Sequence, residues 1–210
     1  MSNLLVISSS PARVAAAGFE LDIKFVEGMK LYSDAWKGEV ACLLWQDDAP
    51  APFSRLYPSA DLPFTLIVKE AGHAVVANDV DAYDIILCSG DDDHIVRNVL
   101  GLGRRNQKFV FVIENALDTR VQILMLDRSR GSLRTLYGIV LATMREVTRR
   151  RALRRADGIQ ANGYPAYKSY APLNPETILF LDGRLGSALM ASDDEMARRR
   201  SHLTSGRRLR

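Results

Sequence analysis

Short, continuously apolar runs alternate along the chain with segments of helical periodicity. The runs that predict strands are Leu4–Ile7, Val40–Trp45, Phe64–Val68, Asp84–Cys88, Phe109–Ile113, Gly158–Ala161 and Thr177–Leu181. This alternation is the sequence signature of βα units, in which each strand is followed by a helix that returns the chain to a parallel sheet.

Within each run the apolar character is continuous and does not alternate with polar positions. Strands of a parallel sheet need apolar residues on both faces, because helices cover both sides of the sheet. An antiparallel sandwich with one solvated face would instead give strict alternation. We therefore predict an α/β fold with a Rossmann-like, doubly wound, mainly parallel sheet and helices on both faces.

Two long helices are predicted from periodicity, over about Leu21 to Trp36 and over about Ser129 to Asp157. In the second, apolar residues recur at steps of three and four and share one helical face, whereas the arginines after Arg145 mostly take other positions. These apolar residues are Leu133, Leu136, Tyr137, Val140, Leu141, Met144 and Val147. The stretch Gln46–Pro63 contains four prolines, so it cannot be one continuous helix or strand along its whole length.

Length and composition indicate one ordinary globular domain. The chain has 210 residues, of which 47% are hydrophobic and 25% charged, and this length allows one well-buried α/β core. Cys42 and Cys88 each lie inside an apolar run, the pattern of buried thiols in a reducing compartment. The N-terminus shows no signal-peptide pattern, so we expect a cytoplasmic protein.

The C-terminal third carries a family resemblance. The segment Arg155-Ala156-Asp157, followed by the strand Gly158–Ala161 and the turn Asn162-Gly163, resembles an element of retaining, family 4-like glycosyltransferases of the GT-B architecture. A short helical pattern over Pro165–Leu173 follows, and Asn174–Arg184 resembles the last strand of the N-terminal domain of such enzymes.

The resemblance implies an N-terminal, acceptor-side domain over residues 1–184. Residues 185–210 would then form a linker and helix toward a second, donor-binding domain, before which this sequence stops. The complete enzyme would transfer a sugar from a nucleotide-sugar donor to a hydroxyl of a sugar or lipid-linked acceptor, with no metal and no cofactor. The half alone would be inactive, and the resemblance does not identify its catalytic residues.

Polar residues that follow the predicted strands are the candidate site residues, because ligands of open α/β sheets bind beyond the carboxyl ends of the strands. Ser9 and Ser10 follow the first strand, where the family usually has a glycine-rich loop near the acceptor, and they could instead form only a polar loop with a helix cap. Asp91, Asp92 and His94 follow the fourth. They could bind acceptor hydroxyls, cap the next helix or, less in keeping with their sequence spacing, hold a divalent cation.

Two more strand ends complete the candidate set. Glu114 and Asn115 follow the fifth strand, and Glu114 could bind sugar hydroxyls or be satisfied by neighbouring backbone amides. Asn162 and Gly163 follow the sixth and could line the donor side or only form a turn.

The arginine-rich stretch Arg145–Arg155 has three interpretations. It could be a solvated helix face, a peripheral contact with an anionic membrane at its inner face, or a nucleic-acid site. We do not expect nucleic-acid binding, since no aromatic residues interleave with the arginines.

Two other functions stay open at this point. A non-catalytic α/β binding or interaction module would fit the same fold. A flavodoxin-like or nucleotide-binding domain would fit it too, although the phosphate-binding loops that such ligands need are not evident.

Overall fold

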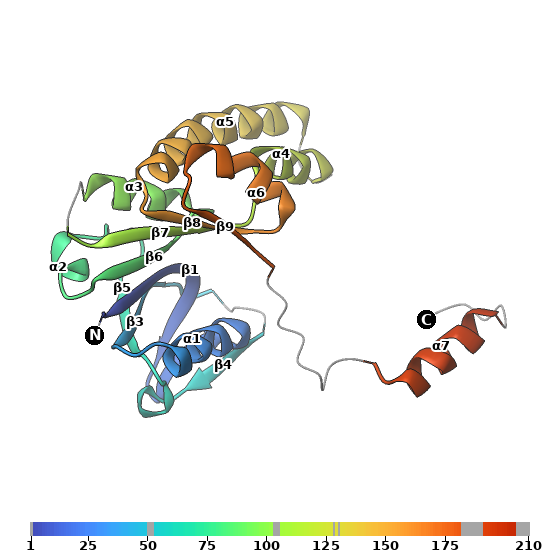
Figure 1. The fold of residues 1–210 in the computed structure, drawn as a ribbon, viewed down its shortest axis with the longest axis horizontal. Helices are drawn as coiled ribbons and strands as arrows, with labels where there is room; N and C mark the ends of the chain where they lie inside the picture. The colour runs from blue at the N-terminus through green and yellow to red at the C-terminus, as the bar shows by residue number, and fades with distance from the viewer. Residues whose placement is uncertain are drawn as a thin grey trace. The chain divides into compact units, whose positions relative to one another are not determined.

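A mostly parallel sheet forms the centre of the larger of the two units of the chain (Figure 1). The computed structural model describes residues 2–49, 53–102, 106–127, 129, 131–181 and 191–204. The chain divides into a unit over Met1–Phe180, which holds the sheet, and a second unit over Leu181–Arg210. The second unit contains one described helix, whose N-terminus is capped by Ser192 and Glu195.

The bounds of the elements are as follows. The strands are β1 (Leu4–Ala15), β2 (Gly18–Asp22), β3 (Val40–Gln46), β4 (Ser54–Tyr57), β5 (Thr65–Lys69), β6 (Ile85–Ser89), β7 (Lys108–Ile113), β8 (Gly158–Asn162) and β9 (Thr177–Phe180). The α-helices are α1 (Ile23–Ala35), α2 (Ala77–Val80), α3 (Asp93–Gly101), α4 (Leu117–Leu126), α5 (Ser132–Arg155), α6 (Tyr164–Tyr170) and α7 (Asp193–Thr204). Short 3-10 helices are η1 (Ser59–Asp61) and η2 (Ala171–Leu173).

The parallel strands lie in the order β5-β3-β1-β6-β7-β8-β9. Numbered along the chain, these strands follow the order 3-2-1-4-5-6-7, the doubly wound order in which the winding reverses between the first and fourth strands. Each of the seven predicted strands is one of them. The predicted Rossmann-like fold class is confirmed.

Strand β1 is longer than the predicted Leu4–Ile7. Its first part pairs in parallel with β3 and β6, and residues from Ala12 to Ala15 pair antiparallel with β2. Strand β2 pairs in turn with β4. This antiparallel extension was not predicted, because its strands are short, half-exposed and not continuously apolar.

Two hydrophobic cores cover the two faces of the sheet. Alternate residues of β1 point to opposite cores: Leu5 and Ile7 pack toward α3, α5 and α6, whereas Leu4 and Val6 pack toward α1. Figure 1 shows α1 on one side of the sheet and these three helices on the other. Both faces of the central strands are therefore buried, which explains their continuously apolar sequence.

Helix α5 forms within the predicted range, but its apolar stripe faces outward. Leu133, the most exposed residue of the stripe, keeps 85% of its surface accessible, whereas Arg149 keeps 1%. The predicted interpretation of the arginine stretch as a solvated face is therefore wrong for Arg149. The cause is a polar network on the inner face of the helix that outweighs the apolar pattern.

Arg149 is the centre of this network. Its Nε donates to the carbonyl oxygen of Gly90 (2.8 Å), Nη1 donates to Glu146 (3.1 Å) and Nη2 donates to Asp93 (2.5 Å). Glu146, also buried, accepts further bonds from Arg150 and from the hydroxyl of Tyr170. Burial, and secondarily the charge of Glu146, raises the pKa of Tyr170.

The carboxylate in the family-like element Arg155-Ala156-Asp157 has a structural role. Asp157 accepts a hydrogen bond from the backbone N–H of Phe109 at the start of β7. The buried Asn174 donates to the carbonyl oxygens of Leu153 and Ala156 at the end of α5. These contacts fix the end of α5 at the amino edge of the sheet, opposite to the edge where ligands of such folds bind.

Replacing Arg149 tests the importance of the buried network. Arg149→Met is expected to lower the free energy of unfolding by about 3–5 kcal/mol, because the buried Glu146 and the half-buried Asp93 would each lose the buried guanidinium as a partner. The control Arg151→Met, at an exposed position of the same helix, is expected to change it by about 0.5 kcal/mol or less. Urea denaturation of both variants gives the comparison, and equal midpoints would contradict the assigned role.

Both cysteines are buried and free, as predicted. Burial raises the pKa of each thiol, so the reactive thiolate is scarce in the folded protein. We expect neither thiol to react with a disulfide reagent at neutral pH until the protein unfolds. Rapid reaction of either thiol with the reagent in the native protein would show that the core around that cysteine opens locally.

Candidate functional site

A pocket of about 240 Å³ lies at the carboxyl ends of β3, β5 and β6, beside Ser9 to Pro11 of β1, which follow the part of β1 that pairs with β6. It is next to the point between β1 and β6 where the winding of the sheet reverses, which is where open α/β sheets bind ligands. Four predicted site residues meet there: Ser9, Ser10, Asp92 and His94. The other lining residues are Pro11, Trp45, Gln46, Asp47, Ala71 and Gly72.

The serines reach the pocket because β1 bulges. Ile7 pairs with Leu43 of β3 and Pro11 pairs with Trp45, so the three residues of β1 between these pairs lie opposite one residue of β3. A bulge bends a strand and redirects its side chains, and Pro11 fits there because it has no N–H to offer a regular ladder. The hydroxyl of Ser8 accepts a hydrogen bond from the N–H of Ser10 and stabilises the bend.

Asp92 combines two roles at the start of α3. Its Oδ1 accepts hydrogen bonds from the N–H groups of His94 (2.7 Å) and Ile95 (3.0 Å), which makes Asp92 the N-cap of the helix. Within the described part of the chain, Oδ2 accepts no hydrogen bond. This oxygen is therefore available to a hydroxyl or amine of a ligand.

The aromatic wall of the pocket is Trp45. Its ring lies edge to face with the imidazole of His94, with centroids 5.2 Å apart, and its indole N–H donates to the carbonyl oxygen of His73 (2.7 Å). Lys69 pairs with Asp79 at 2.6 Å and also donates to the carbonyl oxygen of Ala74. These bonds hold the segment after β5, which carries Ala71 and Gly72, against the end of β3.

Asp91 is engaged within the protein. Its carboxylate accepts from the N–H groups of Glu114 (2.8 Å) and Asn115 (3.0 Å), and it pairs with Arg120 at 2.5 Å. Gly90, directly before it, donates to the carbonyl oxygen of Val112, and a Cβ at this glycine would approach that oxygen to 3.1 Å. Asp91 therefore joins the end of β6 to the end of β7.

The remaining predicted residues lie along the same edge of the sheet, outside this pocket. Glu114 is exposed and Asn115 half-buried after β7, while Asn162 and Gly163 are half-buried at the end of β8. Gly163 has a φ of 86°, which suits glycine, and its N–H donates to Phe180. Adjacent strands are about 4.8 Å apart, so the candidate residues form a row and not one cluster.

Trp45 and Asp47 were missed from sequence. Trp45 ends the second predicted strand and Asp47 comes two residues after it. The expectation that ligands bind at the carboxyl ends of strands, which identified Ser9 and Asp92, applies to them equally. A second hollow of about 690 Å³ continues from the pocket and shares Gln46, Asp47 and Ala71 with it. Among the described residues, no group of three or more His, Cys, Asp or Glu side chains is placed to hold a metal ion.

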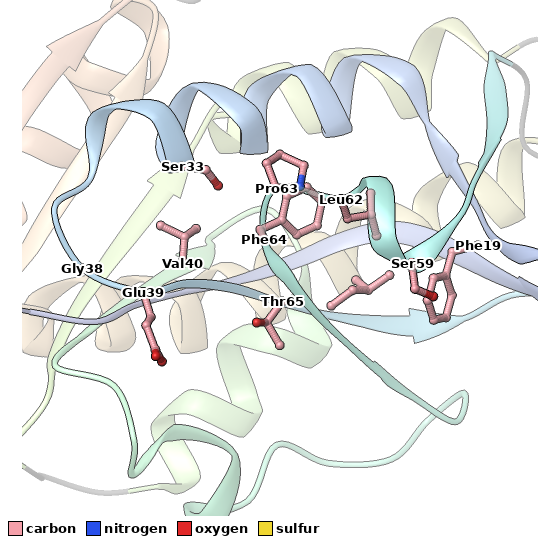
Figure 2. A pocket seen from close by; sticks show the side chains of 11 residues that line it. Phe19, Ser33, Gly38, Glu39, Val40, Ser59, Leu62, Pro63, Phe64 and Thr65 are labelled. Carbon is pink, nitrogen blue, oxygen red and sulfur yellow. The ribbon is translucent and has the colours of Figure 1, made fainter.

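A larger pocket, of about 740 Å³, lies beside α1 (Figure 2). Figure 2 shows Glu39 and Val40 at one end of it and Phe19 and Ser59 at the other. Gly38 to Val40 precede or begin β3, and Thr65 begins β5, so part of this pocket adjoins the amino ends of the strands. Ligands of doubly wound sheets bind at the opposite edge. We therefore rank this pocket second as a candidate ligand site, after the pocket at the carboxyl ends of the strands.

No family model and no curated protein matches this chain. Two solved structures of UGT2 from Phytolacca americana align with it. The complex with UDP-2-fluoro-glucose and pterostilbene has a TM-score of 0.44 and 13% identity, over 92% of this chain and 56% of the other. The apo structure has a TM-score of 0.41 and 12% identity, over 94% and 54%. The chain thus spans about half the length of these structures.

Asp92 offers a test of the two roles of its carboxylate. Asp92→Ala is expected to lower the free energy of unfolding by about 1 kcal/mol through loss of the N-cap, whereas Asp92→Asn should be nearly neutral, since asparagine caps equally well. Thermal or urea unfolding distinguishes them. Equal losses in both variants would mean that the charge, and not the cap, stabilises this end of α3.

Proposed function

We propose that this chain is the N-terminal, acceptor-binding half of a glycosyltransferase. The observation that carries the proposal is the pocket at the winding reversal, which is lined by Ser9 and Ser10, by Asp92, His94 and Trp45. Hydroxyls and carboxylates bind sugar hydroxyls through hydrogen bonds. The indole offers an apolar surface for the C–H groups of a sugar ring or for an aromatic acceptor.

The sequence element around Arg155-Ala156-Asp157 supports the same proposal. It resembles family 4-like, retaining GT-B enzymes, and it occupies the end of the longest helix and the start of β8. In the complete enzyme a second, donor-binding domain would hold the nucleotide sugar and stabilise the leaving diphosphate. The 210-residue chain would then contribute one wall of the active site and be inactive alone.

The volume of the pocket limits the size of the acceptor group that it could enclose. At about 240 Å³ it is smaller than the roughly 300–1,000 Å³ of sites that enclose drug-sized ligands. A single sugar ring or phenol is the size of group that it could take, with the rest of a larger acceptor lying in the adjoining hollow of about 690 Å³.

A non-catalytic α/β binding module is the second candidate. It is favoured by the engagement of Asp91 with backbone amides and with Arg120, which leaves this carboxylate in a structural role. Such a module would bind a hydroxyl-rich ligand at the same pocket without ever transferring a sugar.

Nuclear magnetic resonance of the indole N–H of Trp45 tests the acceptor site. Methyl glucoside and a simple phenol glycoside are the probes, and the variant Trp36→Phe identifies the Trp45 signal. We expect shifts at Trp45, Ser10 and His94, with binding about three- to tenfold weaker in Asp92→Asn, because a charged hydrogen bond is replaced by a neutral one. Ser33→Ala, in the other pocket, should bind normally.

Binding of a flavin at this pocket, with no response to any glycoside, would overturn the proposal in favour of a flavodoxin-like domain. Sugar transfer distinguishes the two remaining candidates. A glycosyltransferase half should transfer sugar from a nucleotide-sugar donor when a donor-binding domain is supplied in trans, whereas a binding module should stay inactive with every donor domain and every nucleotide sugar tested.

A further inference from the structure

The outer face of α5 is apolar over its first four turns. Leu133, Leu136, Tyr137, Val140, Met144 and Val147 are each between 51% and 85% exposed, and steps of three and four residues place them in one stripe. Ile123, Met125 and Leu126 of the neighbouring α4 are also exposed. Single exposed apolar residues are ordinary, but a continuous stripe of this length marks an interaction surface.

The stripe becomes cationic in the last turns of the helix. Arg151, Arg154 and Arg155 follow Val147 at steps of four, three and one, so they continue the same face, and each is exposed. None of the three has an ion-pair partner within the residues that the structure describes. One face of α5 thus presents apolar side chains and then free positive charge.

The helix cannot turn this face inward without losing its buried contacts. Glu146 and Arg149 on the opposite side are fixed to Gly90, Asp93 and Tyr170. Burying the stripe would bring these two charges to the surface and break the bonds to the end of β6. The outward orientation is therefore a stable property of the fold and not an alternative packing of it.

We propose that the outer face of α5 binds the surface of an anionic membrane. Helices that lie in the membrane interface combine an apolar stripe with arginine or lysine, and anionic headgroups attract such cations. No described helix is long and apolar enough to cross a membrane, so α5 would lie in the plane of the interface. The surface differs from the predicted Arg145–Arg155 contact, because Arg149 is buried and apolar residues do much of the binding.

A second copy of the chain fits this face less well. The one acidic residue between Ser132 and Arg155 is Glu146, which is buried and already bonded to Arg149 and Arg150. Parallel pairing of two α5 helices would bring the arginines of both copies together, and antiparallel two-fold pairing would place the arginines of each copy against the apolar stripe of the other. In neither arrangement does a described carboxylate of the helix neutralise them. Anionic headgroups neutralise those charges, which is why the membrane is the occupant that the charge distribution favours.

Co-sedimentation with lipid vesicles tests the proposal. The probes are vesicles of phosphatidylcholine alone and vesicles in which about a third of the lipid is phosphatidylserine. We expect binding to the anionic vesicles at low salt, at least about tenfold weaker binding to the neutral ones, and a loss of affinity as the salt concentration rises.

Three variants of exposed residues separate the contributions. Leu136→Gln/Val140→Gln/Met144→Gln removes the stripe, and Arg151→Gln/Arg154→Gln/Arg155→Gln removes the charge; each should weaken binding about tenfold or more. Leu31→Gln, at an exposed apolar position of α1, is the matched control and should bind like the unaltered chain. Circular dichroism establishes that all variants fold.

Two outcomes would overturn the proposal. Equal binding of the stripe variant and the Leu31→Gln control would show that α5 is not the contact. A dimer that the stripe variant converts to monomer, with no vesicle binding by either, would show that a second copy covers the face. The acceptor-pocket residue Asp92 lies on different elements, so the Asp92→Asn variant should bind vesicles normally whether or not the proposed transferase function holds.

Discussion

The buried guanidinium of Arg149 is the interaction on which the arrangement of the site depends. It bonds to the carbonyl oxygen of Gly90 and to Asp93, on either side of Asp91 and Asp92, and so fixes the segment between β6 and α3. Asp91 then fixes the end of β7 and Asp92 caps α3. A buried charge is stable only when it is paired and its hydrogen-bonding groups have partners. Because Arg149 needs Gly90 and Asp93 as partners, the segment between β6 and α3 takes one conformation although it has no regular structure.

The sequence predicted the parallel sheet well, because continuously apolar runs such as Phe109–Ile113 arise only where both faces of a strand are covered. It failed for α5. A stripe of apolar residues at helical spacing ordinarily faces the core. Nothing local to the helix indicates that Glu146 and Arg149 have partners directly after β6, on α3 and on α6. Those partners are distant in sequence, and only the tertiary structure brings them together.

The candidate site was likewise predicted only in part from the sequence. The principle that ligands of open α/β sheets bind beyond the carboxyl ends of the strands correctly placed Ser9, Ser10, Asp92 and His94 at one pocket. It succeeded because topology alone determines which edge of the sheet these residues occupy. Sequence could not assign different roles to Asp91 and Asp92, since adjacent carboxylates in a loop are equivalent until their hydrogen bonds are known. The bulge in β1 that exposes the serines also depends on how β3 pairs with it, which no single segment encodes.

The central place of β1 has a consequence for how the chain acquires its fold during synthesis. This strand is made before the other strands of the sheet, yet its neighbour β6 ends only at Ser89, so one edge of β1 has no partner until translation has passed Ser89. Contacts between segments this far apart in sequence form slowly, and unpaired apolar strands are prone to aggregate. The nascent chain is therefore most vulnerable before β6 leaves the ribosome, when chaperones would protect it most.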